Sequence, residues 1–159
     1  MAVTSVGLDR ILETVLYADD LEAAERFYRD VLGLEVDSRK DGIFVFFRLK
    51  GAMLLLFRAE AARANEMVPA HGAIGPGHAC FAVAESELDG WKERLERQGV
   101  RIEHEQAWPR GSRSFYFRDP AGNSLEIASP LIWGMADRRG ADATSVSEPD
   151  APQPVDKRA

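Results

Sequence analysis

The sequence predicts an α+β fold in which two βαβββ modules form a cupped, mostly antiparallel sheet. The order strand, helix and three strands occurs twice along the chain, which indicates an internal duplication. The glycines that end the two helices correspond, Gly33 with Gly99, and so do the turn glycines Gly51 and Gly122. We therefore expect four regions, namely a first module over residues 1–58, a connector over 59–76, a second module over 77–134 and a disordered tail over 135–159.

The first module begins with a strand over residues 11–18, a run rich in branched and apolar side chains. Asp19 or Asp20 is placed to cap a helix over about residues 21–32, and Gly33 ends it. Three more strands are predicted, with turns at Lys40-Asp41-Gly42 and Lys50-Gly51 between them, over residues 34–38, 43–49 and 52–58. Glycines and prolines in residues 59–76 then mark the connector.

The second module repeats this order. A strand is predicted over residues 77–83, Ser86 is placed to cap a helix over about 87–98, and Gly99 ends it. The remaining strands are expected at residues 100–105, 113–118 and 124–128. The last two are joined by the turn Asp119-Pro-Ala-Gly-Asn123, where proline presets one φ angle and glycine supplies a positive one. After Trp133 the chain has prolines and no aromatic residue, which is typical of a disordered tail.

The composition limits the classes of partner. The net charge of -6 and the pI of about 5.1 argue against binding DNA or RNA. The sequence has no apolar run as long as a membrane span and no secretory signal at its start, so no membrane association is expected. With Cys80 as its single cysteine, the chain forms no internal disulfide, and we expect a reducing, cytoplasmic environment.

Three polar residues occupy strand positions where apolar ones are expected, and they carry the functional prediction. Glu13 lies in the first strand, His78 in the equivalent strand of the second module, and Glu126 in the last strand between Leu125 and Ile127. If the modules pair side by side, these three side chains meet in one cleft, where two carboxylates need a cation. Their oxygen and nitrogen donors suit a divalent metal ion such as Zn, Mn, Fe, Co or Ni. Three protein ligands leave coordination positions for water or substrate.

Each residue also has an ordinary interpretation. Glu13 would simply face water on an edge strand, His78 would be a hydrogen-bonded strand histidine, and Glu126 would form an ion pair with Arg113 or Arg118 of its hairpin. His71, in a glycine-rich loop, and His104, in a polar strand, are both expected to be exposed, with His71 the better candidate for a loop near the site.

The chain resembles the vicinal oxygen chelate superfamily, which includes glyoxalase I, fosfomycin-resistance enzymes, bleomycin-resistance proteins and extradiol dioxygenases. The resemblance covers about residues 9–130 and rests on the stretches Leu12–Leu21, Arg26–Gly33, Gly77–Val83 and Phe115–Glu126. It implies metal-ligand positions at Glu13, His78 and Glu126. The fourth ligand position of glyoxalase I falls on Leu55, which cannot bind a metal, and this counts against an ordinary glyoxalase I.

Ser114 and Tyr116 match substrate-side positions of the fosfomycin-resistance enzymes, so the resemblance implies that they bind substrate. We expect a glyoxalase-like, metal-dependent enzyme that performs lyase, isomerase or addition chemistry on a small oxygen-rich molecule. Glu13 or Glu126 would also act as catalytic base, and a homodimer is expected. The alternatives are a metal-free drug-binding protein with an aromatic cleft (Phe44, Phe46, Phe47, Trp108 and Tyr116) and, ranked lower, an extradiol dioxygenase.

Overall fold

The computed structural model describes residues 7–137 and confirms the predicted fold class. The first half contains β1 (Glu13–Tyr17), α1 (Leu21–Arg26), the π-helical turn η1 (Phe27–Val31), β2 (Glu35–Lys40), β3 (Phe44–Leu49) and β4 (Ala52–Phe57). A short helix, α2 (Ala59–Arg63), follows. The second half contains η2 (Glu85–Glu87), α3 (Leu88–Arg97), η3 (Pro130–Trp133) and the strands β5 (His78–Ala82), β6 (His104–Ala107), β7 (Arg113–Arg118) and β8 (Ser124–Ala128).

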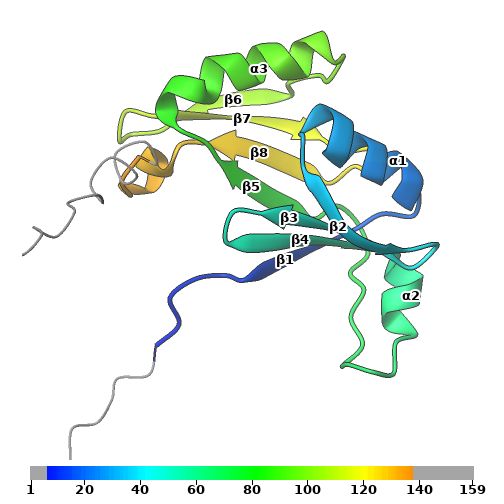
Figure 1. The fold of residues 1–159 in the computed structure, drawn as a ribbon. Helices are drawn as coiled ribbons and strands as arrows, with labels where there is room; N and C mark the ends of the chain where they lie inside the picture. Colours follow the sequence, from blue (N-terminus) through cyan, green and yellow to red (C-terminus); the bar gives the residue numbers. More distant parts are fainter. Residues whose placement is uncertain (1–6, 138–159) are drawn as a thin grey trace, which may run out of the picture.

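The strands form two four-stranded sheets of the same topology (Figure 1). Their orders are β1-β4-β3-β2 and β5-β8-β7-β6, and in each sheet the first strand is parallel to the last while the other neighbours are antiparallel. The parallel pair follows from the helical crossover after each first strand. β1 and β5 therefore each lie at one edge of their sheet, with β2 and β6 at the opposite edges.

Three elements differ from the sequence predictions. The first helix changes its hydrogen bonding at Phe27, and the Leu32 amide donates to the Phe27 carbonyl five residues earlier, at 3.2 Å. The strand expected over residues 100–105 instead begins at His104, because the stretch before it packs apolar side chains on the core. The connector contains α2, where its alanines gather. Most of the expected tail, residues 138–159, lies outside the described residues.

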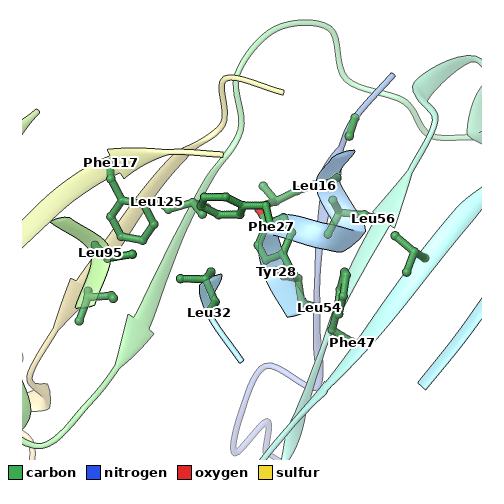
Figure 2. Packing of buried hydrophobic residues seen from close by; sticks show 14 of the residues in the cluster. Leu16, Phe27, Tyr28, Leu32, Phe47, Leu54, Leu56, Leu95, Phe117 and Leu125 are labelled. Carbon is green, nitrogen blue, oxygen red and sulfur yellow. The ribbon is translucent and has the colours of Figure 1, made fainter. Parts of the chain in front are cut away.

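The core is shared by both halves, and α1 and η1 supply its centre (Figure 2). Tyr28 is fully buried and its ring lies 5.3 Å from that of Phe47 in β3. Phe27 lies 6.4 Å from Phe117 in β7. Since a buried phenylalanine replaced by alanine costs about 3–5 kcal/mol, these contacts make the halves stabilise one another.

Two reciprocal contacts tie each helix to the opposite half. Tyr28 donates a hydrogen bond to Asp119 Oδ2 at 2.8 Å, and the Nε of Arg94 in α3 donates to the carbonyl of Val31 at 2.9 Å. Tyr28 and Arg94 hold equivalent positions, each five residues before the glycine that ends its helix. The internal duplication thus extends to the interface between the halves.

The predicted turn between β7 and β8 is also a clamp between the halves. Its Asn123 side chain donates to the Tyr17 carbonyl at 3.0 Å and accepts from the Gly77 amide at 2.8 Å. The end of β1 therefore lies beside the beginning of β5. A side chain at Gly77 would displace the Leu16 side chain, because a Cβ would lie 2.7 Å from Leu16 Cδ2.

Strand alternation gives each sheet a core face and an outer face. We call the outer face the side that points away from the shared core. On the first sheet it carries Glu13, Val15, Tyr17, Phe44, Phe46, Met53, Leu55 and Phe57. On the second sheet it carries His78, Cys80, His104, Gln106, Ser114, Tyr116, Ser124 and Glu126.

Candidate functional site

Glu126 is the most unusual polar residue of the outer faces. It lies in the middle of β8 with only 7% of its side chain exposed. Its Oε1 atom is buried without a hydrogen-bond partner, and its Oε2 atom lies 3.4 Å from Nε2 of His78. Because a buried carboxylate oxygen without a partner is costly, this site has an unmet need for a cation or a donor.

His78 is held in one orientation beside this carboxylate. Its Nδ1 lies 2.9 Å from the Ser124 carbonyl, which can only accept, so Nδ1 carries a proton. In the neutral ring the Nε2 lone pair then faces the oxygen of Glu126. Two lone pairs at this distance repel unless a proton or a metal ion lies between them. An imidazole fixed by a carbonyl at its second nitrogen is also the usual arrangement of metal-bound histidines.

A row of four side chains crosses the outer face of the second sheet through Glu126. Strand register places His104 opposite Tyr116, Tyr116 opposite Glu126, and Glu126 opposite Cys80. The Tyr116 ring lies between two imidazoles, with centroids 6.3 Å from His78 and 6.0 Å from His104. We call His104, Tyr116, Glu126 and Cys80 the polar row.

Glu126 also influences its neighbours in the polar row. Burial, and then the charge of Glu126, raises the pKa of the Cys80 thiol. Burial likewise raises the pKa of Tyr116, the neighbouring Ser114 hydroxyl lowers it, and Glu126 raises it further. Both groups therefore keep their protons at neutral pH, so Tyr116 is available as a hydrogen-bond donor.

Ser114 lies one row further along β7, opposite Ala128. It is 1% exposed, and its Oγ accepts a hydrogen bond from Nε1 of Trp108 at 2.9 Å. Trp108 in turn lies against Trp133, with ring centroids 6.4 Å apart. Ser114 is thus close to Tyr116 as expected, but the indole covers it.

Glu13 does not join His78 and Glu126 within one chain. It is the exposed first residue of β1, whereas the clamp through Asn123 brings the last residue of β1, Tyr17, to the start of β5. Four residues of strand separate Glu13 from that point, about 13 Å. Accordingly, among residues 7–137 of a single chain, no group of three His, Cys, Asp or Glu residues is close enough to hold a metal ion.

The structure contradicts the ordinary interpretation of Glu126 and agrees with that of Glu13. Glu126 does not pair with its hairpin arginines, because Arg113 binds Asp89 and Glu105 while Arg118 binds Glu103 at 3.0 Å. Glu13 does lie on an edge strand, exposed, as its ordinary interpretation predicts.

The outer face of the first sheet carries an aromatic cluster. Phe44 and Phe46 stack with centroids 4.1 Å apart, and Phe57 packs edge-on to Phe46 at 5.1 Å. The connector covers one end of it, where His71 lies against Phe57 and forms a 2.6 Å hydrogen bond with Tyr17. His71 is therefore half-buried rather than exposed.

Phe47, one of the aromatic residues named for a drug-binding cleft, is fully buried in the core. Sequence reasoning also missed members of the site. The sequence prediction assigns Cys80 no role in the site, although Cys80 lies two residues after His78 and therefore on the same face of β5. His104 is exposed, as expected, but its pairing with Tyr116 depends on the register of β6, which begins four residues after the predicted start. Alternation along β5, which places His78 and Cys80 on one face, is the sequence signal that identifies Cys80 as a neighbour of the site.

No helix within residues 7–137 is long and apolar enough to cross a membrane.

Comparison with known proteins agrees with this architecture. A crystal structure of lactoylglutathione lyase from Agrobacterium tumefaciens is 49% identical and matches with a TM-score of 0.77, covering 80% of this chain and 98% of that chain. A glyoxalase/bleomycin resistance protein/dioxygenase from Nocardioides is 29% identical, with a TM-score of 0.63, and the match covers 79% of this chain and 85% of that chain.

Among curated proteins, metallothiol transferase FosB of Staphylococcus saprophyticus is 28% identical over 119 residues, which is 74% of this chain and 75% of the transferase. The family model described as Glyoxalase/Bleomycin resistance protein/Dioxygenase superfamily matches residues 10–127, which include all but the last residue of the two sheets and contain the Glu126–His78 pair. With the duplicated fold and these matches together, the chain belongs to the Glyoxalase/Bleomycin resistance protein/Dioxygenase superfamily.

Proposed function

We propose that this protein is a glyoxalase-like, metal-dependent enzyme that acts on a small oxygen-rich molecule. The observation that carries the proposal is the His78–Glu126 pair, in which an oriented imidazole faces a buried carboxylate with one unpartnered oxygen. A divalent cation bound there would act as a Lewis acid that polarises a substrate oxygen. One nitrogen and carboxylate oxygens suit Zn, Mn, Fe, Co or Ni.

We further propose that the third ligand, Glu13, comes from a second copy of the chain. Glu13 and His78 are the equivalent first residues of the two edge strands, so a homodimer that sets β1 of one copy beside β5 of the other would bring them together. Such a dimer also covers the β1 and β5 edges of the two sheets. Each dimer then contains two equivalent sites, as two-fold symmetry requires.

The other residues have defined tasks in this proposal. Tyr116, which keeps its proton, donates a hydrogen bond to a substrate oxygen above the polar row. Ser114 holds the Trp108 indole, which forms one wall of the site. Glu13 or Glu126 would also act as the proton acceptor of the reaction.

Metal analysis of protein purified without chelators tests the metal site. We expect about one divalent ion per chain, with two sites in a two-fold dimer. His78→Ala should lose the ion, whereas His104→Ala, at the exposed end of the polar row, should retain it. A metal-free protein that resists reloading with Zn, Mn, Co or Ni would contradict the proposal.

Mixing two defective variants tests whether the site lies between copies. Glu13→Ala and His78→Ala homodimers each lack a complete site, but a mixed dimer has one site with all three ligands. After exchange of subunits, about a quarter of the wild-type metal sites should return. No recovery, in a mixture shown to contain mixed dimers, would place all the ligands in one chain or remove Glu13 from the set.

Lyase chemistry is the first reaction to test, since the lactoylglutathione lyase match is 49% identical. Formation of S-lactoylglutathione from methylglyoxal and glutathione is followed by absorbance with each metal. Leu55 is paired with Val15 and Phe46, so that strand supplies no fourth ligand. If this substrate pair is inert while the metal binds, isomerase and addition reactions on other oxygen-rich molecules become the next to test.

The aromatic cluster of the first sheet favours one alternative, a metal-free binding protein of the bleomycin-resistance type. Such a protein would bind an aromatic drug equally well with and without a chelator. Copurified iron together with turnover of catechol would instead support the dioxygenase alternative.

A further inference from the structure

A cavity of about 600 Å³ opens at the end of the molecule that carries α2 (Figure 1). Four segments line it, namely the loop between β1 and α1, the helix α2, the end of the connector and the turn between β7 and β8. Its volume lies in the range of about 300–1,000 Å³ that is typical of small-molecule sites. None of its lining residues belongs to the polar row or to the His78–Glu126 pair.

The cavity carries charges of both signs. Asp19 and Asp20 line it from the β1–α1 loop, and Arg63 lines it from the last turn of α2. Asp20 uses one carboxylate oxygen to cap α1, where it accepts from the Ala23 amide at 2.9 Å. Asp19 forms no hydrogen bond or ion pair with the residues that the structure describes, so its carboxylate is open to a ligand. A molecule with a cationic and an anionic group would therefore find a partner for each.

Contacts with the connector hold Arg63 at the cavity wall. Its Nη1 donates to the Gly72 carbonyl at 3.1 Å. A Cβ at Gly72 would lie 2.6 Å from Arg63 Cγ, so the arginine stem passes closely over this glycine, whose φ angle is +143°. One hydrogen bond leaves most of the guanidinium N–H groups for a ligand. Because the side chain is already positioned, it loses less conformational entropy when it binds a carboxylate.

Apolar side chains form much of the remaining wall. Pro120 and Ala121 contribute from the β7–β8 turn, and Ala73, Ile74 and Pro76 contribute from the connector. Ile74 is 92% exposed, so a carbon chain or a branched side chain in the cavity would gain apolar contact by covering it. These side chains offer no hydrogen-bond donor or acceptor, which favours an apolar body between the charged groups of the ligand.

We propose that this cavity binds a small zwitterion, a molecule with one ammonium group, one carboxylate and an apolar carbon body. The ammonium group faces Asp19, the carboxylate faces Arg63, and the apolar body covers Ile74. The inference goes beyond the proposed function, because it assigns a second site to the chain. A bound zwitterion would connect the β1–α1 loop to the connector and to the β7–β8 turn, and would stabilise the folded chain by binding to it.

Two isomeric amino acids test the ligand class. Leucine carries both charges on one carbon, and 6-aminohexanoate carries them at the two ends of an apolar chain. We expect at least one of them to bind, as measured by calorimetry, and to raise the midpoint of thermal unfolding. The result also shows how far apart the two charges of the ligand must be.

Analogues of each isomer test the contribution of each group. Hexanoate and 4-methylpentanoate lack the ammonium group, whereas pentylamine and leucinamide lack the carboxylate. Each should bind about tenfold weaker or more than its parent, because one charged partner is lost. Glycine, which lacks the apolar body, should also bind about tenfold weaker or more.

Variants of the lining residues locate the site. Asp19→Asn and Arg63→Gln should each weaken binding about tenfold, and Ala73→Trp should weaken it by filling the cavity. Glu66→Gln, which removes an exposed carboxylate of the connector outside the cavity, is the matched control and should leave affinity unchanged. Asp19→Asn remains informative if Arg63→Gln disturbs the connector, because Asp19 has no partner among the described residues to lose.

Three results would overturn the inference. The first is that neither isomer binds. The second is that the isomer that binds does so equally well to Asp19→Asn and Arg63→Gln, which would put its site elsewhere. The third is that hexanoate or pentylamine matches its parent, which would make the cavity a site for singly charged ions. Metal binding by wild-type protein and by all four variants, measured in parallel, should be unchanged, so failure of this inference is distinct from failure of the proposed function.

Discussion

The two sheets share a topology and a core pattern but differ in the chemistry of their outer faces. In the first sheet one row across the strands reads Ser38, Phe46, Leu55 and Val15. The equivalent row of the second sheet reads His104, Tyr116, Glu126 and Cys80. Register makes the counterparts Phe46 and Tyr116, Leu55 and Glu126, and Val15 and Cys80.

The core faces did not diverge in this way. Leu54 and Leu56 of β4 correspond to Leu125 and Ile127 of β8, and all four are at most 2% exposed. Phe47 and Phe117 are likewise counterparts, each fully buried. The comparison shows that packing restricts one side of each sheet to apolar residues, while the other side was free to become a ligand-bearing surface in one half and an apolar surface in the other.

The largest expected effect tests the equivalence of the core faces. Phe47→Ala and Phe117→Ala should each lower the free energy of unfolding by about 3–5 kcal/mol, because both leave a cavity in the shared core. Urea denaturation followed by circular dichroism measures this. If one variant proves nearly neutral, the two halves do not contribute equally to the core.

The next effect tests the difference between the outer faces. Glu126→Gln keeps the size of the side chain but removes its charge, and it should weaken metal binding about 100-fold, or about 2.7 kcal/mol. Its counterpart variant, Leu55→Met, should leave metal affinity within about twofold, because Leu55 lies on the first sheet in a row without carboxylate or imidazole groups. Metal affinity is measured by competition with a chromophoric chelator, with exposed Glu22→Gln as a charge control. Similar losses from both rows would contradict the assignment.

A smaller effect concerns the reciprocal contacts between the halves. Tyr28→Phe should cost about 1–3 kcal/mol at neutral pH, because Asp119 loses a buried hydrogen bond. Burial, and then the charge of Asp119, raises the pKa of Tyr28 above that of an unfolded tyrosine. Above about pH 10 the unfolded chain releases this proton while the folded chain keeps it, so stability falls as pH rises.

The pH dependence supplies the measurement. Wild-type protein should lose about 1.4 kcal/mol per pH unit through Tyr28 above about pH 10, and Tyr28→Phe should lack this contribution. Urea unfolding at several pH values between about 8 and 11 compares the two slopes, on either side of the unfolded tyrosine pKa. Parallel slopes would show that Tyr28 ionises equally readily in both states.

The smallest effect concerns Cys80. Cys80→Val replaces Cys80 of the polar row with the residue type of its counterpart in the first sheet, Val15. We do not place Cys80 among the proposed ligands, since it forms no three-residue metal group with His78 and Glu126 within the described part of one chain. Metal affinity should therefore change by less than about threefold, an effect well below that of a lost hydrogen bond to a charged group. A loss as large as that of Glu126→Gln would make the thiol a ligand.

The sequence predicts the fold class because hydrophobic alternation and turn glycines are local signals. β7 and β8 match their predicted bounds, since a proline–glycine turn limits them on one side. Alternation also identifies Glu126 and His78 as unusual strand residues. β6 is displaced because residues such as Ile102 are apolar for packing rather than for pairing with a strand.

The spatial relations of the site depend on contacts between distant residues, which no local pattern contains. Asn123 bonds to Tyr17 across 106 residues, and that bond decides which end of β1 meets β5. The sequence prediction has the first strands of the two modules side by side, which does not specify which of their ends meet. Whether a second copy supplies the third metal ligand depends on how two chains associate, and the periodicity of one sequence does not contain that information.

The Asn123 clamp bears on how this chain can exchange parts with its relatives. A chimera joined within the connector would inherit β1 from one parent and the β7–β8 turn from the other. It would fold well only if the Tyr17 carbonyl, the Gly77 amide and the Asn123 side chain still met in the same arrangement. The clamp therefore limits which parents can be recombined in the connector. Side-chain substitutions on the outer faces do not change its contacts.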